Sequence, residues 1–155
     1  MIKKKIKKNR GFVLLFVVML SSIILAITLG VADISLKEIK FSTSARDTNE
    51  AFFAADTGAE CALFYDKSTV NAFINPSPST IICNGNTVRL NGSDPSWNFV
   101  VSGLGSEGKG CAEVAVDKSD SGSICNSPTC IVSKGYNDCN IPNSGRVERQ
   151  LELSY

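Results

Sequence analysis

The hydrophobic residues of this chain are concentrated in one segment near its N-terminus. Residues 12–32 read FVLLFVVMLSSIILAITLGVA, twenty-one positions without a charged side chain. An α-helix of this length rises about 30 Å, which matches the hydrocarbon core of a bilayer. A buried core helix rarely needs so long an uninterrupted apolar run. The pattern therefore predicts a membrane-spanning helix from Phe12 to Ala32.

The helical pattern continues beyond the apolar segment. Residues 33–66 contain no proline and a single glycine, Gly58, and their small or apolar residues recur at helical spacing. We therefore expect one continuous helix from Phe12 to Phe64 or Tyr65, whose second half packs in a soluble domain. The alanines that would let strands approach this half closely are Ala55, Ala59 and Ala62.

The rest of the chain has the pattern of short β-strands. Residues 67–79 include Asn-Pro-Ser-Pro, which cannot continue a helix, and are expected to form a linker. Segments with strand character, separated by Asn-Gly, Gly-Ser and Pro turns, are 80–83, 87–90, 97–102, 112–116, 130–133 and 147–155. The last of them alternates apolar and polar side chains clearly. The expected fold class is α+β: one long N-terminal helix, residues 12–65, whose second half packs on a small antiparallel β-sheet head, residues 80–155, with disulfides.

Charge is distributed unevenly along the chain. Six Lys or Arg residues and no acid precede the apolar run, so the other ten bases face fifteen acids, a net charge of −5. Basic residues beside a first apolar helix are retained in the cytoplasm. The expected topology is a single pass through the inner (cytoplasmic) membrane, with a cytoplasmic N-terminus and an exported head. The acidic balance of the exported part argues against general nucleic-acid binding, which requires clustered Lys and Arg.

All six cysteines fall on the exported side, where oxidation to disulfides is possible and a small domain benefits from cross-links. Six cysteines allow fifteen pairings, and the pattern does not select one. A structural zinc site is the alternative, but the chain has no histidine and no Cys-x-x-Cys. We therefore expect disulfides and no metal. The candidate cysteines are Cys61, Cys83, Cys111, Cys125, Cys130 and Cys139.

The segment GLGSEGKG at 103–110 matches G-x-G-x-x-G and nearly matches a phosphate-binding loop. Such loops need a following helix, whereas the next residues, CAEVAVDK, alternate like a strand. Gly110 also stands where a Ser or Thr would hold magnesium. We expect a flexible hairpin loop and no nucleotide cofactor.

Three further features of the sequence bear on calcium binding, glycosylation and catalysis, and we expect none of these three. Asp117 and Asp120 do not complete a calcium-binding EF-hand, because Pro128 stands at its last ligand position. Asn91-Gly92-Ser93 fits a glycosylation sequon, but Asn-Gly is also an ordinary hairpin turn, which we favour. The absence of histidine excludes Ser-His and Cys-His nucleophiles, so we expect no enzyme and no catalytic residues.

Three patches of the sequence carry a family resemblance. The basic leader that ends in Gly11 and is followed by Phe12 and a long apolar helix resembles the class III signal peptide of type IV pilins and pseudopilins. The segment AFFAADTGAECALFYD, residues 51–66, resembles the alanine-rich helix end of PilX-like minor pilins. The C-terminal IVSKGYNDCNIPNSGRVERQLELSY resembles the closing hairpin of that group.

The resemblance implies processing of the N-terminus. In this family a prepilin peptidase cuts after the glycine, and the new N-terminal residue, often Phe, is commonly N-methylated. The cut would fall between Gly11 and Phe12, which makes residues 1–11 a cleaved leader and residues 12–32 a transmembrane and assembly helix.

The resemblance also implies a structural function. The protein would wait in membrane lipid and then pack beside other pilin or pseudopilin subunits in an extracellular filament. Small side chains that permit close helix contact are Ser22, Ala26 and Gly30. Major pilins of this family carry Glu at the fifth mature position, which here is Phe16, and the related pseudopilin without this Glu is associated with the filament tip. Phe16 therefore favours a minor, tip or priming subunit.

Two alternatives stay open. A pseudopilin of a type II secretion or DNA-uptake machine would share the same processing and differ only in its partners. An unprocessed, single-pass membrane-anchored surface binding protein would keep residues 1–11.

Overall fold

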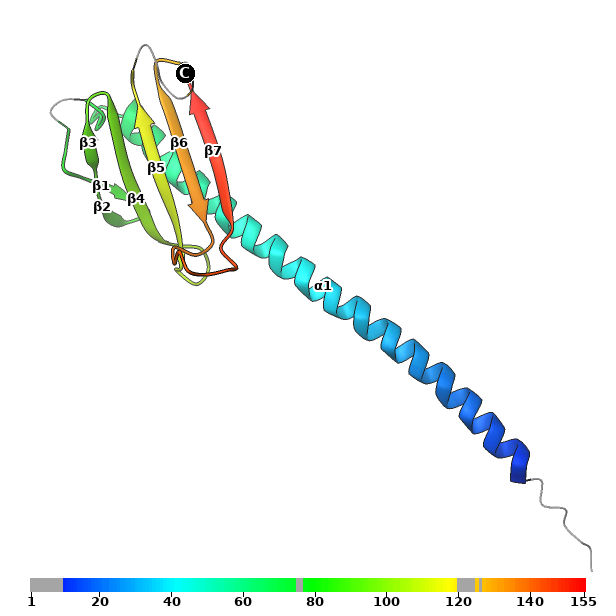
Figure 1. The fold of residues 1–155 in the computed structure, drawn as a ribbon. Coiled ribbons are helices and arrows are strands. Elements are labelled where there is room, and N and C mark those ends of the chain that lie inside the picture. The colour runs from blue at the N-terminus through cyan, green and yellow to red at the C-terminus, as the bar shows by residue number, and fades with distance from the viewer. Residues whose placement is uncertain (1–9, 75–76, 120–124, 126) are drawn as a thin grey trace, which may run out of the picture. The chain divides into compact units, whose positions relative to one another are not determined.

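The computed structural model describes residues 10–74, 77–119, 125 and 127–155. One α-helix, α1 (Arg10–Lys67), precedes seven strands in the described part of the chain (Figure 1). The strands are β1 (Thr80–Cys83), β2 (Asn86–Arg89), β3 (Asn91–Ser93), β4 (Ser96–Leu104), β5 (Gly110–Asp117), β6 (Cys130–Tyr136) and β7 (Glu148–Ser154). This is the expected α+β arrangement of one long N-terminal helix followed by a small antiparallel head with disulfides.

The structure divides into two compact parts, one ending at Thr43 and one running from Ser44 to Tyr155. The described residues of the first part, 10–43, all belong to α1. Side chains 12–43 are exposed without exception. Side chains 12–43 are therefore not buried by packing against any described residue.

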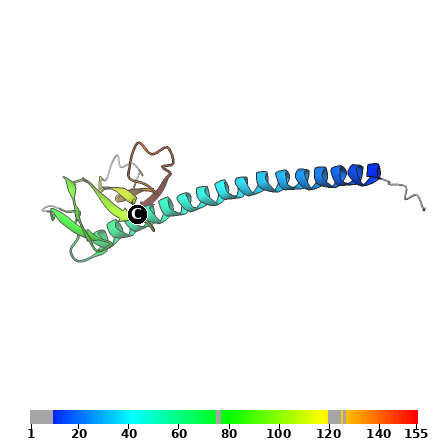
Figure 2. The same cartoon turned by 90° about the horizontal axis from the view of Figure 1, so that it is seen from below.

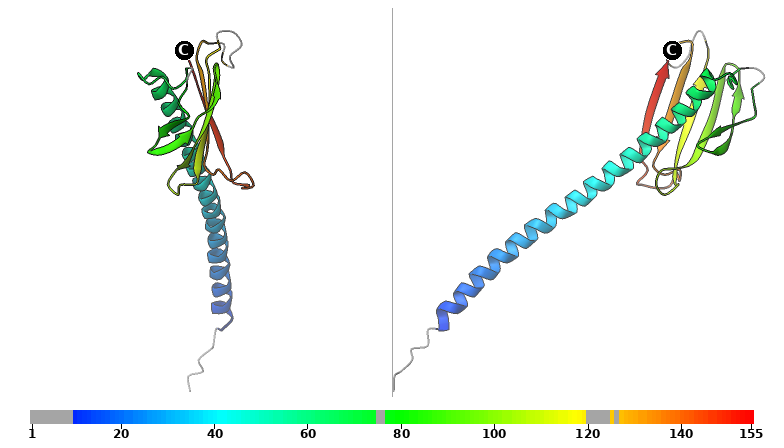
Figure 3. Two further views of the ribbon diagram at one scale, coloured as in Figure 1. Left: turned by 90° about the vertical axis from the view of Figure 1, so that its left-hand side faces the viewer. Right: turned by 180° about the vertical axis from the view of Figure 1, so that it is seen from behind.

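The second part, which we call the head, contains a five-stranded antiparallel sheet of order β3-β4-β5-β6-β7 and a separate two-stranded sheet of β1 and β2. Successive strands pair in sequence order, so the larger sheet is a simple meander. The C-terminal half of α1, residues 44–67, lies along one face of this sheet (Figure 3).

Small residues let α1 approach the sheet closely. Ala51, Ala55 and Ala59 are at most 3% exposed. A Cβ added to Gly135 of β6 would collide with backbone atoms of Ala51 and Ala55, and one added to Gly58 would lie 2.6 Å from the Ser133 hydroxyl. The expected close approach of strands to the alanine face is confirmed.

One buried polar group lies at this contact. Ser133 is fully buried, and its hydroxyl donates a hydrogen bond of 2.7 Å to the backbone carbonyl of Ala55. That carbonyl lies inside α1, so the hydroxyl is satisfied without interrupting the helix. A buried hydroxyl without such a partner would destabilise the fold by about 1–3 kcal/mol.

Large side chains fill the core beside the small-residue contact. Phe73 stacks on Phe99 of β4 at 6.4 Å between ring centroids and lies 5.9 Å from the ring of Trp97. Ala72 and Phe73 are fully buried, although they belong to the segment expected to be a linker. The helix ends at Lys67, at the start of this segment as expected, and two apolar residues of the segment complete the core.

The predicted elements agree with the observed ones except around residue 91. The predicted helix begins at Phe12 and ends at Phe64 or Tyr65, and the observed helix extends two or three residues further at either end. The six predicted strands are present, and 97–102, 112–116 and 130–133 are parts of the longer strands β4, β5 and β6. Residues 75–76 of the predicted linker lie outside the described residues.

The prediction of an Asn-Gly hairpin turn at residues 91–92 is wrong. Asn91–Ser93 forms β3 and pairs with β4, and the connection between them is Asp94-Pro95, joined by a cis peptide bond. The two-residue turn with positive φ at both positions is Asn84-Gly85, between β1 and β2. The dipeptide Asn-Gly occurs at both 84–85 and 91–92, so it does not by itself show which of the two forms a turn. The strand with which each segment pairs decides this.

The close helix contact predicts the effect of one added methyl group. We expect Gly135→Ala to destabilise the head by about 3 kcal/mol, because the new Cβ collides with the α1 backbone. The control is Gly145→Ala, whose added Cβ comes no closer than 3.4 Å to Asn143 Oδ1 and should cost less than about 0.5 kcal/mol. Denaturant unfolding in detergent, followed by the fluorescence of the single tryptophan, Trp97, measures both. Equal unfolding midpoints for the two variants would contradict the contact.

Candidate functional site

The first candidate site is the exposed apolar segment of α1. Within the described residues, α1 is the one helix long and apolar enough to cross a membrane. Its large apolar side chains between Phe12 and Ala32 are from 44% exposed at Leu20 to 76% exposed at Phe12. Full burial of one such side chain is worth about 1.5–3 kcal/mol, so the segment as a whole strongly favours an apolar environment.

The hydroxyl groups of this segment form hydrogen bonds within the helix itself. The hydroxyls of Ser21, Ser22 and Thr28 each donate a hydrogen bond of 2.8–3.0 Å to the backbone carbonyl three residues earlier. In hydrocarbon an unsatisfied hydroxyl is costly, because no water is present to bond it. The segment can therefore enter an apolar environment without leaving these three hydroxyls unbonded.

The structure places the predicted processing residues at the start of α1. Gly11 lies in the first turn of the helix and Phe12 follows it. Residues 1–9 of the predicted leader lie outside the described residues. Phe12 is 76% exposed and Phe16 is 56% exposed.

The predicted contact residues of the assembly helix share one side of it. Ser22, Ala26 and Gly30 succeed one another at four-residue intervals, which places them along one helix face. A Cβ added at Gly30 would meet nothing within 4 Å, so this glycine is not required by any contact inside the chain. The face is free to contact another helix.

All six predicted cysteines form disulfides in the structure. The pairs are Cys61–Cys83, Cys111–Cys139 and Cys125–Cys130, with Cα–Cα distances of 5.6–5.8 Å. These distances lie in the normal range for a disulfide. The presence of disulfides is as expected, and the pairing is what the sequence left open.

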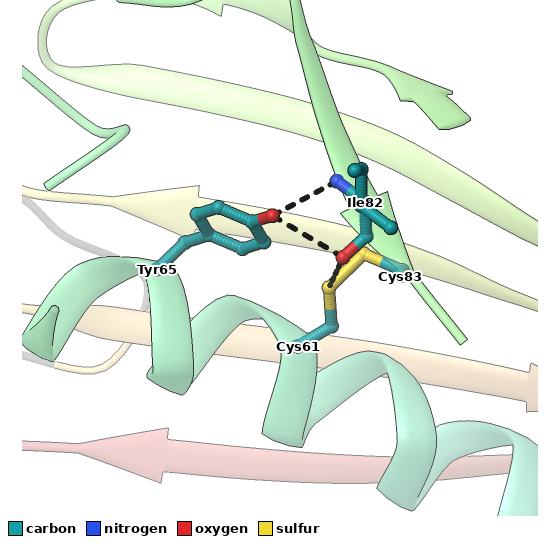
Figure 4. The surroundings of a disulfide bond; sticks show 4 residues. All are labelled: Cys61, Tyr65, Ile82 and Cys83. Carbon is teal, nitrogen blue, oxygen red and sulfur yellow. Dashed lines mark hydrogen bonds between the residues drawn. A yellow bond between two sulfur atoms is a disulfide. The ribbon is translucent and has the colours of Figure 1, made fainter. Parts of the chain in front are cut away.

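The Cys61–Cys83 disulfide ties the two-stranded sheet to α1 (Figure 4). Tyr65, one helical turn after Cys61, supports the same connection: its hydroxyl accepts a hydrogen bond of 3.0 Å from the Ile82 amide and donates one of 3.3 Å to the Ile82 carbonyl. One covalent and two polar links therefore hold strand β1 against the helix. Sequence reasoning missed Tyr65, because a lone tyrosine on a helix gives no signal of a partner seventeen residues away.

The Cys111–Cys139 disulfide holds residues 137–147 to the sheet. This segment lies on the face opposite to α1 (Figure 2), where the Arg146 guanidinium stacks 3.7 Å from the centre of the Tyr136 ring. Burial, with a further contribution from Glu148, raises the pKa of the Tyr136 phenol to about 12. The phenol therefore stays neutral over the physiological range. The disulfide and the Arg146 contact attach the segment to this face of the sheet.

A second cluster missed by sequence reasoning lies at the end of α1. Asp66, whose side chain is 5% exposed, forms an ion pair with Lys118. The Tyr155 hydroxyl donates a hydrogen bond of 2.6 Å to the other oxygen of the Asp66 carboxylate. Burial and the Asp66 charge raise the pKa of this phenol. The three residues are too far apart in sequence for spacing to suggest the cluster.

Residues 105–109 of the glycine-rich segment form the hairpin loop between β4 and β5, as predicted, and the element that directly follows the loop is strand β5. The Ser106 hydroxyl of the loop donates a hydrogen bond of 2.7 Å to Glu50 of α1, which lowers the pKa of that carboxyl. Arg46 adds ion pairs to Glu50 and to Glu107 of the loop. These contacts attach the loop to the helix.

Among the described residues, no group of three or more His, Cys, Asp or Glu side chains could hold a metal ion. Asp120, one of the two aspartates considered for calcium, lies outside the described residues. Comparison with known protein families, with curated proteins and with solved structures finds no match to this chain. The function is therefore inferred from the residues and geometry of the chain itself.

The disulfide pairing predicts that Cys61–Cys83 and Cys125–Cys130 contribute unequally to the free energy of unfolding of the head. Replacing both Cys61 and Cys83 by Ala should destabilise the head by about 3 kcal/mol, because this cross-link closes a loop of 22 residues in the unfolded chain. The matched control replaces Cys125 and Cys130, which close a loop of only 5 residues and should cost about 2 kcal/mol. Denaturant unfolding of the three proteins in one detergent measures the order. A larger loss from the Cys125 and Cys130 pair would contradict this assignment.

Proposed function

We propose that this protein is a structural subunit of a type IV pilus-like filament, in a minor, tip or priming position. It is inserted in the membrane by α1, processed by a prepilin peptidase, and assembled beside other pilin or pseudopilin subunits. The observation that carries the proposal is the uncharged helical segment from Phe12 to Ala32, which begins directly after Gly11 and whose side chains are exposed in the described structure.

The exposed helix supports both stages of this function. In a bilayer its apolar side chains contact lipid, and in a filament they contact the helices of other subunits. Transfer between the two environments costs little, because both are apolar. The face formed by Ser22, Ala26 and Gly30 permits close helix contact, which is the usual basis of helix association where no hydrophobic driving force exists.

The residue at position 16 supports a specialised position in the filament. A carboxylate in the middle of a membrane helix costs about 2.5–3.5 kcal/mol on the insertion scale, so it persists only where it has a partner. Phe16 leaves the first turns of the mature helix without any carboxylate to pair with the terminal amine of a neighbour. A subunit at the tip or a priming subunit does not need this pair.

The head supports display outside the cell. Disulfides persist in oxidising compartments, and three of them join elements of the head. The cytoplasmic side would instead hold the basic leader, as the distribution of Lys and Arg predicts. We infer no reaction and no cofactor for this head, whose role is to be presented on the fibre.

N-terminal processing tests the proposal directly. The protein is recovered from membranes of cells with and without an active prepilin peptidase, and its intact mass and N-terminal sequence are determined. With the peptidase the chain should begin at Phe12 and carry one added methyl group, and without it the chain should keep the basic leader. Retention of the leader in both strains would contradict the filament function and favour the anchored binding protein.

Substitutions on the small-residue face test assembly separately from insertion. We expect Ser22→Leu combined with Ala26→Leu to reduce incorporation into filaments several-fold, because bulky side chains prevent close helix contact. Membrane insertion should be unchanged, since leucine is favourable in lipid. The matched control is Val17→Leu combined with Ile24→Leu, which places leucines on the opposite side of the helix, where the side chains are already large and exposed. Normal incorporation of the Ser22 and Ala26 variant would contradict the contact face.

A further inference from the structure

Three side chains with complementary chemistry meet beside the end of α1. Lys118 Nζ is in direct contact with Asp66 Oδ1, and it donates a hydrogen bond of 3.4 Å to Asn71 Oδ1. The side chains of Lys118 and Asp66 are only 19% and 5% exposed. An amine, a carboxamide and a carboxylate thus share one mostly buried site in the head.

The backbone holds the two ends of this contact in place. The Lys118 amide donates to the Pro95 carbonyl at 2.8 Å, and the Asn71 amide donates to the Ser68 carbonyl at 3.1 Å. Phe73, two residues after Asn71, is fully buried. Reacting groups held at contact distance by a folded chain gain a large effective concentration, which accelerates an otherwise slow condensation.

We propose that Lys118 and Asn71 condense into an intramolecular isopeptide bond, with Asp66 as the group that transfers protons. Lys118 supplies the nucleophilic amine and the side-chain carbonyl carbon of Asn71 is the electrophile. Asp66 is the only one of the three that is unchanged at the end of the reaction. The bond joins the segment after α1 to the residue that follows β5.

The reaction balances without an oxidant, a metal or an activated co-substrate. Asp66 accepts a proton from the Lys118 ammonium, which frees the nitrogen lone pair to attack Cγ of Asn71. The new C–N bond forms as the C–N bond to the carboxamide nitrogen breaks, and two of the three ammonium protons leave with that nitrogen. Lysine ammonium and asparagine amide therefore become one secondary amide and one free ammonium ion.

The two oxygens of the Asp66 carboxylate have different partners. The Tyr155 hydroxyl occupies Oδ2 at 2.6 Å, which leaves Oδ1 directed at Lys118.

Such a bond would act as a fourth cross-link of the head, in addition to the three disulfides. It would tie the end of α1 to the sheet by a link that reducing agents do not break. This inference does not depend on the filament function, because it concerns only residues of the folded head.

Peptide mass spectrometry of the full-length protein tests the bond. After reduction, alkylation and digestion with trypsin, residues 68–89 should appear joined to residues 110–134, because an acylated Lys118 is no longer cleaved. The joined species should be lighter than the sum of its two peptides by one ammonia. Separate peptides, with normal cleavage after Lys118, would overturn the proposal.

Two variants control the assignment. Lys118→Arg keeps a cation for Asp66 but cannot form the amide, so both peptides should be released unjoined. Asn71→Asp should give a joined species of the same mass as the native one, now formed with loss of water from the unreacted chain. A link in the native protein from Lys118 to the peptide that contains Asp66 would overturn the choice of Asn71 as electrophile.

Discussion

The head depends on the close approach between the alanine face of α1 and the middle strands of the sheet. Gly135 of β6 has no side chain where the helix backbone passes, and the Ser133 hydroxyl binds the Ala55 carbonyl within the contact. With the helix this near, little apolar volume remains under its centre. The large side chains Phe73, Trp97 and Phe99 therefore gather beside the contact and provide most of the aromatic core.

Different restraints act around the edge of this core. The two-stranded sheet is joined to α1 by Cys61–Cys83, and residues 137–147 are joined to the far face by Cys111–Cys139. A domain of this size buries limited apolar surface, so cross-links that restrict the unfolded chain contribute a substantial part of its stability. The cluster of Asp66, Lys118 and Tyr155, in which the Asp66 and Lys118 side chains are mostly buried, lies at another edge, where the helix ends.

The two halves of α1 suit different environments, although they belong to one continuous helix. Up to Ala32 the side chains are apolar and exposed, and the hydroxyls bond the helix's own carbonyls, which suits an apolar environment. From Ala51 onward the helix instead presents small residues to the sheet, and its exposed side chains are both charged and aromatic: Glu60, Lys67, Phe52, Phe53 and Phe64. The proposed filament function uses this division, with one half for insertion and assembly and the other for carrying the displayed head.

Local patterns in the sequence determined the helix, the six predicted strands, the close packing at Ala55, Ala59 and Ala62, and the oxidation of the cysteines. These features follow from periodicity, residue size and composition, which act over a few neighbouring residues. Tertiary structure alone decided the cysteine pairing, the burial of Phe73, the strand at Asn91–Ser93 and the meeting of Asp66 with Lys118 and Tyr155. Each of these joins residues far apart in the chain or depends on which segments pack together, and no local pattern records such a contact.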